Sequence, residues 1–418
     1  MKVTGIIAEC NPLHEGHIYL LQEARKRTGA DYVIVALSGD YVQRGAPSIV
    51  SKELRTEALL REGADLVLEL PLYAACAGAD YFARGAAALL ESTGVVTDLA
   101  FGSECGDITK LQKAADLIKN ETNEYSEILQ RGLRTGLTYP EARSNAAGSQ
   151  GLPSSPNDLL GTEYLKALAL FHSTITPHAI LRTQCRSASD IRSDLLAKRR
   201  RTDPILCRDD FSDHLLHALY NAAGPEDLSC FLDVSQDLAG RILHELPYYD
   251  TFSSFTDAVK TRNYTYTRVS RALMHILLGM RTEVMQDFDS RFGLCGWIRP
   301  IGFRRTARPL LRSIAAGSSV PFLDKLSRAD ELLSPGPASI LREEIRAEFL
   351  YDIMAARRTG KSADGVKPGP AKQMVIIQSF TVPRSSSGES DHSHEDSDDQ
   401  RCDPGDNTLF NNNSESPF

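Results

Sequence analysis

Short apolar runs alternate with helix-like segments over the first 175 residues, and this alternation constrains the fold more than any other feature. The runs are Val3–Ala8, Tyr32–Leu37, Leu66–Leu70 and Leu99–Phe101. Between them, apolar residues recur at helical spacing in residues 17–28, 52–62 and 81–92. Strands that alternate with helices in this way build a parallel sheet. We therefore predict an α/β domain over residues 1–193.

The rest of the chain changes character twice. From residue 194 the strand signal fades, and helical spacing in His214–Ala222, Val259–Leu278 and Leu323–Leu333 predicts a mainly helical domain over residues 194–360. Residues 361–418 become rich in Gly, Pro, Ser and acidic residues, so we expect a disordered acidic tail. The formal net charge is -8, and the acidic residues after position 388 account for it, which leaves the body nearly neutral.

Composition excludes some classes of protein. The 8 cysteines are scattered without a Cys-x-x-Cys pair, so the sequence predicts neither a disulfide framework nor a metal site. No stretch approaches the roughly 20 apolar residues of a membrane span. We expect a cytoplasmic protein without a membrane partner; no pattern predicts its oligomeric state.

The strongest motif is His14-Glu15-Gly16-His17, which follows the first predicted strand and opens a helix. Gly16 permits close approach of a phosphate, and the helix N-terminus offers free N–H groups and a positive dipole end. Two imidazoles can donate hydrogen bonds to a triphosphate whose α-phosphoryl group is attacked. The alternative is an ordinary helix start with surface histidines.

A second motif, Ser187-Ala188-Ser189-Asp190-Ile191-Arg192, also predicts a helix start. The hydroxyls of Ser187 and Ser189 and the Arg192 guanidinium form a second anion site, unless this is a plain capped helix. Lys52 and Arg55 lie one turn apart on another predicted helix, so Lys52 is a candidate catalytic residue. A solvated helix face is the alternative for this pair.

Several motifs together resemble one family. Ala8–His17, Ser38–Gly45, Gly63–Pro71 and Phe101–Glu104 occur in the order found in the bacterial tRNA(Met) cytidine acetate ligase family, and the resemblance runs to about residue 312. It implies a Rossmann-like nucleotidyltransferase domain that uses ATP and acetate to make acetyl-adenylate. The acetyl group then passes to the wobble cytidine of elongator methionine tRNA, with release of AMP and pyrophosphate. The connection from Arg182 to Ser187 is shorter than is usual in that family.

The resemblance also implies which residues bind ATP, with Mg2+ accompanying the nucleotide. His14 and His17 take the phosphate role and are the other candidate catalytic residues. The implied contacts are Ile7, Ala8, Glu9, Cys10, Asn11, Pro12, Leu13, His14, Glu15, Gly16, His17, Ile18, Tyr19, Leu20, Gly102, Asn157 and Arg182.

Basic residues interleaved with tyrosines mark the helical half as the tRNA-binding part. Lys260, Arg262, Tyr264 and Arg268 combine charges for phosphates with a ring for stacking unpaired bases. Residues 198–201 and a group of arginines between Arg299 and Arg308 are further candidates. These side chains could instead cover solvated helix faces.

Two other functions stay open. A nucleotidyltransferase that acts on a small molecule would share both phosphate motifs, although such chains are shorter. A tRNA-binding homologue without catalysis would keep the basic patches; retention of His14, Gly16 and His17 argues against it. A Lys-Met-Ser-Lys-Ser-like loop, expected of an aminoacyl-tRNA synthetase, is absent.

Overall fold

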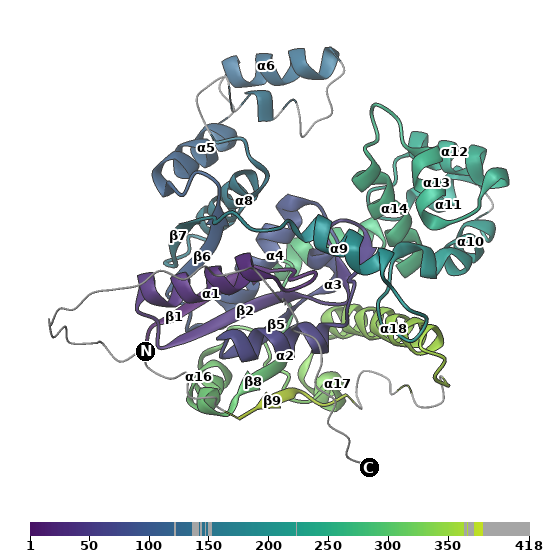
Figure 1. Ribbon diagram of the computed structural model, residues 1–418. Helices are drawn as coiled ribbons and strands as arrows, with labels where there is room; N and C mark the ends of the chain where they lie inside the picture. The colour runs from purple at the N-terminus through teal and green to yellow at the C-terminus, as the bar shows by residue number, and fades with distance from the viewer. Residues whose placement is uncertain are drawn as a thin grey trace, which may run out of the picture. The chain divides into compact units, whose positions relative to one another are not determined.

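The computed structural model describes residues 1–120, 123–135, 153–222, 224–362 and 372–378, together with 142, 144–146, 148 and 366. Its main sheet has seven strands in the order β7-β6-β1-β2-β5-β8-β9 (Figure 1). The strands are β1 (Val3–Ala8), β2 (Tyr32–Ser38), β5 (Leu66–Leu70), β6 (Asp98–Ser103), β7 (Thr176–Leu181), β8 (Pro300–Arg304) and β9 (Val375–Ile377). A small hairpin, β3 (Tyr41–Val42) and β4 (Ala46–Pro47), follows β2.

The strand order places a ligand crevice next to β1. Strands β1, β2, β5, β6 and β7 pair in parallel, and β1 lies between β2 and β6. The chain therefore builds outward to β5 and then returns to add β6 and β7 on the other side of β1. In open α/β sheets the ligand binds at this reversal, beyond the carboxyl ends of the strands. The loops after β1 and β6 border that crevice, and the predicted Rossmann-like α/β fold is confirmed.

Helices cover both faces of the sheet. On one face, α1 (Glu15–Thr28) and α2 (Lys52–Glu62) bury Leu21, Leu59 and Leu60 against β1 and β2. On the other face, α4 (Ala79–Ser92), α8 (Pro156–Leu170) and α16 (Arg308–Gly317) contribute to a second core. The short α3 (Leu72–Ala75) follows β5, and α5 (Ile108–Asn120) and α6 (Asn123–Arg134) lie between β6 and α8 in the chain.

The second half is mainly helical, as predicted. Its elements are α9 (Ala188–Ala197), η1 (Arg208–Phe211), α10 (Ser212–Tyr220), α11 (Pro225–Ser229), α12 (Gln236–Glu245), η2 (Leu246–Tyr248), α13 (Phe252–Val259), α14 (Tyr266–Leu278), α15 (Thr282–Phe292), η3 (Arg305–Ala307), η4 (Leu326–Arg328), α17 (Ala329–Leu332) and α18 (Pro335–Arg358). Two of the predicted helices are longer than the observed ones. The predicted helix Val259–Leu278 is interrupted between α13 and α14, where Thr265 caps α14. The segment Leu323–Leu333 contains the short helices η4 and α17.

The chain returns to the sheet after the helices. Strand β8 runs antiparallel to β5, and β9 pairs in parallel with β8. Residues 1–379 form one compact unit, so the predicted boundaries at residues 193 and 360 stay predictions about function. The apolar run Met374–Ile377 lies in the predicted tail, and it forms β9 because it pairs with an open sheet edge. Residues 379–418 lie outside the described residues, in which no helix is long and apolar enough to cross a membrane.

Candidate nucleotide site

The loop after β1 holds the two histidines in a fixed arrangement. His14 is the N-cap of α1, and its Nδ1 accepts a hydrogen bond from the N–H of Gly16 at 3.1 Å. Nδ1 of His17 accepts from the backbone N–H of His14 at 3.4 Å, and the two ring centroids are 4.0 Å apart. A neutral imidazole that accepts at Nδ1 carries its proton on Nε2. Each ring therefore keeps an Nε2–H donor for a further partner.

Both histidines are neutral at neutral pH. Burial, followed by the charge of Arg182, lowers the pKa of His14. Burial, His14 and Arg182 lower the pKa of His17 to about 3. Neutral rings stabilise a phosphate by hydrogen bonding alone, so the cationic charge at this crevice comes from arginine and from the N-terminus of α1.

Gly16 is required by packing. A Cβ atom at this position would lie 2.9 Å from Sγ of Cys185 and 3.0 Å from Cε1 of His14. The short connection between β7 and α9 thus passes directly over the start of α1. A side chain at position 16 would displace either this connection or the His14 ring.

The second motif is tied to the first through one arginine. Ser187 caps α9, because its hydroxyl accepts from the N–H of Asp190 at 3.1 Å. Nη1 of Arg192 donates to the carbonyl of Asn11 at 2.8 Å, and Nη2 donates to Oγ of Ser189 at 3.0 Å. Two predicted anion-binding motifs, about 180 residues apart in the chain, therefore lie side by side.

A third set of predicted residues meets around one carboxylate. Oε1 of Glu104 accepts from Nδ2 of Asn157 at 2.6 Å and from Nη1 of Arg182 at 3.2 Å. Gly102 lies beneath Arg182, since a Cβ atom there would be 3.4 Å from Cγ of that arginine. The structure thus brings Gly102, Asn157 and Arg182 together at the end of β6. Glu104 belongs to the Gly-Ser-Glu motif, although the sequence assigned it no role.

The remaining residues of the predicted ATP loop differ in accessibility. Ile7 and Cys10 are buried in the cores on opposite faces of the sheet, so only their backbone can meet a ligand. Leu13, Tyr19 and Leu20 pack against the core under α1. Glu15 is exposed in the first turn of that helix. The role of these residues in binding ATP stays a prediction.

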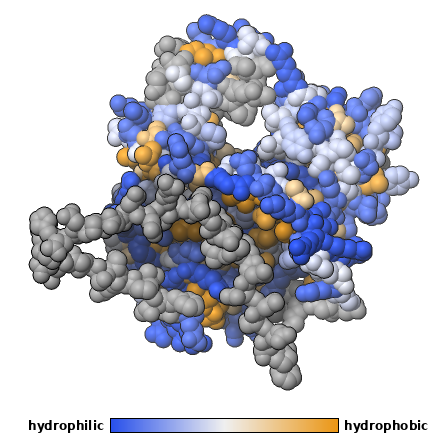
Figure 2. All heavy atoms as spheres, in the orientation of Figure 1, coloured by the Kyte–Doolittle hydropathy of each residue, from blue (hydrophilic) through white to orange (hydrophobic). Residues whose placement is uncertain are grey.

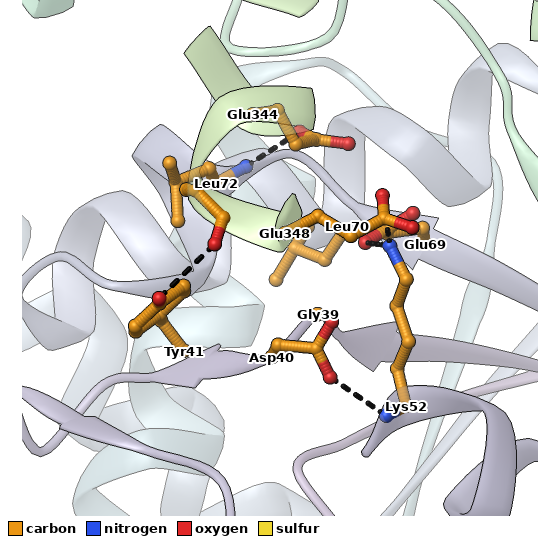
Figure 3. Close-up of a pocket in the computed structure, with 10 residues that line it drawn as sticks. Gly39, Asp40, Tyr41, Lys52, Glu69, Leu70, Leu72, Glu344 and Glu348 are labelled. Atoms are coloured by element: carbon orange, nitrogen blue, oxygen red, sulfur yellow. Dashed lines mark hydrogen bonds and ion pairs between the residues drawn. The ribbon is translucent and has the colours of Figure 1, made fainter. Parts of the chain in front are cut away.

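Lys52 and Arg55 are placed differently from either sequence expectation. The Lys52 side chain is only 2% exposed, and its Nζ lies 2.6 Å from Oε1 of Glu69 and 2.8 Å from Oε2 of Glu348. Figure 3 shows this ammonium group turned toward the two glutamates, beside a cavity of about 10 Å³. Arg55 is buried and donates to the carbonyl of Glu9 at 2.7 Å. The pair does not form a solvated helix face, and a catalytic role for Lys52 would require the carboxylates to release it.

The predicted RNA-binding residues lie at the start of α14 and just before it. Lys260, Arg262 and Arg268 are exposed. The Tyr264 hydroxyl hydrogen-bonds to Oγ of Ser235 at 2.9 Å, and the Arg268 guanidinium lies 5.0 Å from the centre of the Tyr264 ring. The face in Figure 2 is mostly hydrophilic, with hydrophobic residues in separate small groups.

The prediction that Arg299 belongs to an RNA-binding group of arginines is wrong. Arg299 is 5% exposed and is paired with Glu69 at 2.7 Å and Glu348 at 3.1 Å. A buried arginine between carboxylates is not available to RNA phosphates. The sequence offered no sign of this, because Glu348 lies 49 residues further along the chain.

The strand order of the sheet reverses next to β1, and a His-x-Gly-His motif opens the helix that follows β1. Together these features are typical of nucleotidyl transferases. The family model described as "HIGH Nucleotidyl Transferase" matches residues 1–364. The tRNA(Met) cytidine acetate ligase of Acetivibrio thermocellus is 37% identical over 393 residues, covering 84% of this chain and 94% of the relative. The ligase of the same name from Fervidobacterium nodosum is 32% identical, covering 84% and 90%.

A solved structure agrees with these relatives. Thermotoga maritima TmcAL bound with alpha-thio ATP superposes with a TM-score of 0.79 at 26% identity, covering 91% of this chain and 100% of the other. The chain therefore belongs to the tRNA(Met) cytidine acetate ligase family within the HIGH nucleotidyl transferases.

Proposed function

We propose that this enzyme uses ATP to join acetate to the exocyclic amine of the wobble cytidine of elongator methionine tRNA, in the cytoplasm. The observation that carries the proposal is the meeting of His14, His17, Arg182 and Arg192 at the reversal point of the sheet. The names of the relatives, and the ATP analogue bound to the Thermotoga maritima protein, support the choice of substrates.

The arrangement fits a triphosphate. The Nε2–H groups of His14 and His17 and the first N–H groups of α1 donate toward phosphate oxygens. Arg182 and Arg192 supply positive charge, and Gly102 lets the Arg182 side chain pack closely over the end of β6. Among the described residues, no cluster of three or more His, Cys, Asp or Glu side chains is arranged to hold a metal ion. We propose that Mg2+ arrives on the phosphates of ATP, as it commonly does at nucleotide sites.

The reaction has two halves. Acetate attacks the α-phosphoryl group and displaces pyrophosphate, while the histidines and arginines neutralise the charge that develops on the phosphates. The mixed anhydride then acylates the weakly nucleophilic amine, and AMP leaves. We propose that residues 1–193 perform the chemistry and that residues 194–360, with Lys260, Arg262, Tyr264 and Arg268, bind the tRNA.

One assay separates this proposal from its alternatives. The enzyme is incubated with labelled acetate and ATP, with methionine tRNA or with a transcript in which the wobble cytidine is replaced by uridine. We expect AMP release and label in the RNA only with the cytidine-containing tRNA. Acetate-independent turnover of ATP with a small molecule would favour another nucleotidyl transferase, and RNA binding without AMP release would favour an inactive homologue.

A further inference from the structure

Acyl transfer to an amine releases a proton, and the two histidines are poorly suited to accept it. Nδ1 of each ring already accepts a backbone N–H, and Nε2 carries the ring proton. Glu104 is also occupied, because Oε1 accepts from Asn157 and Arg182 and Oε2 accepts from the N–H of Asp158. A proton acceptor for the second half of the reaction must lie elsewhere at the crevice.

Two carboxylates beside the histidines remain: Glu15 is exposed in the first turn of α1, whereas Glu9 is sheltered. Glu9 follows β1 directly, at the carboxyl end of that strand, and it is half-buried. Its Oε1 accepts from the N–H of Gln43, in the β3–β4 hairpin, at 2.9 Å. Within the described part of the chain, no hydrogen bond or ion pair engages Oε2. One oxygen is thus anchored, and the other is free to accept.

The surroundings of Glu9 suit an incoming nucleic acid. Arg44, at the tip of the hairpin, is exposed, and Arg192 and Arg208 are half-buried. Arg208 donates to the carbonyls of Gly45 and Arg44 at 3.0 and 3.1 Å and lies over the Tyr266 ring. Placing several arginines close together is unfavourable unless an anion neutralises their repulsion. The phosphates beside a target nucleotide supply such anions.

The hairpin links this cluster to the predicted tRNA-binding helix. A Cβ atom at Gly45 would lie 2.3 Å from the Cα of Arg271, so the hairpin tip rests directly on α14. Oγ of Ser270 donates to the carbonyl of Gly45 at 2.7 Å. A continuous set of contacts therefore runs from Tyr266 on α14 through Arg208 and the hairpin to Glu9.

We infer that Glu9 accepts the proton of the cytidine amine during acetyl transfer, with Arg44 and Arg208 holding the flanking phosphates. This inference rests on the proposed function. The amine nitrogen forms a bond to the acetyl carbonyl carbon, and the bond from that carbon to the phosphate oxygen breaks. AMP leaves with the electron pair, and the amine proton passes to Oε2 of Glu9 and then to water. A carboxylate also matches the hydrogen-bond donors of a cytosine amine.

The charge environment is consistent with a proton acceptor. Burial raises the pKa of Glu9, although the Gln43 hydrogen bond and the charges of Arg44, Arg192 and Arg55 act in the opposite direction. The other titratable groups that interact with it are Cys10, Cys76 and Tyr164, whose pKa values are all raised by burial. A base is most effective when its pKa lies near the working pH.

The test separates the two halves of the reaction in Glu9→Gln, whose amide oxygen can still accept from Gln43. Acetyl-adenylate formation is followed by acetate-dependent exchange of pyrophosphate into ATP without tRNA. Transfer is followed in a single turnover after tRNA is mixed with preformed acetyl-adenylate. We expect transfer to fall by about 10²–10⁴-fold and exchange to fall far less. The matched control is Glu57→Gln on the exposed side of α2, where Glu57 pairs with Arg61.

Other outcomes would overturn the inference in distinguishable ways. Equal losses of exchange and transfer would place Glu9 in the nucleotide site, and unchanged transfer would remove it from the chemistry. A wild-type enzyme that transfers no acetate label to the cytidine-containing tRNA would refute the proposed function itself. If Glu9→Gln fails to fold, the pH dependence of the wild-type enzyme provides the test. The rate of acetyl transfer must fall with decreasing pH through a single titration above the ordinary glutamate range, whereas the rate of pyrophosphate exchange must not.

Discussion

Lys52→Met tests whether the buried lysine has a structural or a catalytic role. The substitution keeps the length of the side chain and removes the ammonium group between Glu69 and Glu348, both of which are nearly inaccessible. Burial and Arg299 act to lower the pKa of Lys52, but Glu69, Glu348 and Asp40 outweigh them and raise it. The lysine is therefore charged at neutral pH, and its loss leaves carboxylates short of a partner.

The magnitude follows from what remains in the cluster. Removing one partner of a buried ion pair costs about 3–5 kcal/mol. Arg299 still contacts both glutamates, and Lys372 lies 3.0 Å from Oε1 of Glu348, so the lower figure applies. Over the 379-residue unit, an unfolding entropy of roughly 2.1 cal/mol/K per residue gives about 0.8 kcal/mol/K. A loss of about 3 kcal/mol then lowers the melting temperature by about 4 °C.

Calorimetry and the exchange assay together decide between the roles. Lys26→Met is the control, because the Lys26 side chain is 80% exposed and pairs with Glu23 at the long distance of 3.7 Å. The melting temperature of this variant should change by less than about 1 °C. We expect Lys52→Met to retain pyrophosphate exchange well below its melting temperature. An unchanged melting temperature combined with lost exchange would refute the structural role and support direct catalysis.

Three further outcomes are expected. Replacing His14 or His17 with Ala should abolish turnover with little loss of tRNA affinity in filter binding; equal loss of both would contradict their assigned role. Burial, followed by Glu69, raises the pKa of Glu344 to about 8, so the folded protein holds a proton there that the unfolded chain has released above about pH 4.5. The wild-type protein therefore loses stability as the pH rises from about 4.5 to about 8. In thermal melts, the melting temperature of Glu344→Gln relative to wild type should rise over this range. A relative rise as the pH falls would contradict the raised pKa. Replacing Lys260 and Arg262 with Ala should weaken tRNA binding and reduce the salt slope by about one per phosphate contact, whereas an unchanged slope would exclude phosphate contacts.

Local patterns were enough for the central strands but not for the edges. Val3–Ala8 and Leu66–Leu70 are mostly aliphatic, with Thr4, Gly5 and Glu69 as the exceptions, and nearly all of their residues are buried. Both strands were predicted with the observed bounds. Strand β7 was missed because Pro177 and His178 interrupt its apolar pattern at the sheet edge. Strand β8 begins with a proline and joins the sheet antiparallel only after about 230 further residues, so no local pattern predicts it.

The candidate site shows the same division. His14, Gly16 and His17 form a local motif whose geometry follows from helix capping, so the sequence was enough to find it. The hydrogen bond from Arg192 to the Asn11 carbonyl depends on tertiary folding. Glu9 stood inside the recognised motif, but its free oxygen becomes visible only once the hairpin occupies the other one.

The β3–β4 hairpin contacts both α18 and α14. The Tyr41 hydroxyl donates to the carbonyl of Ala347 at 3.0 Å, and the Tyr351 hydroxyl donates to the carbonyl of Ser48 at 2.9 Å, so α18 fixes the hairpin at both ends. The hairpin tip contacts α14, while Gln43 holds Glu9. The helix proposed to bind tRNA thus contacts an element that is hydrogen-bonded to the proposed proton acceptor. Because these contacts are buried and short, they favour one position of Glu9 before substrate arrives, which is the preorganisation that acyl transfer requires.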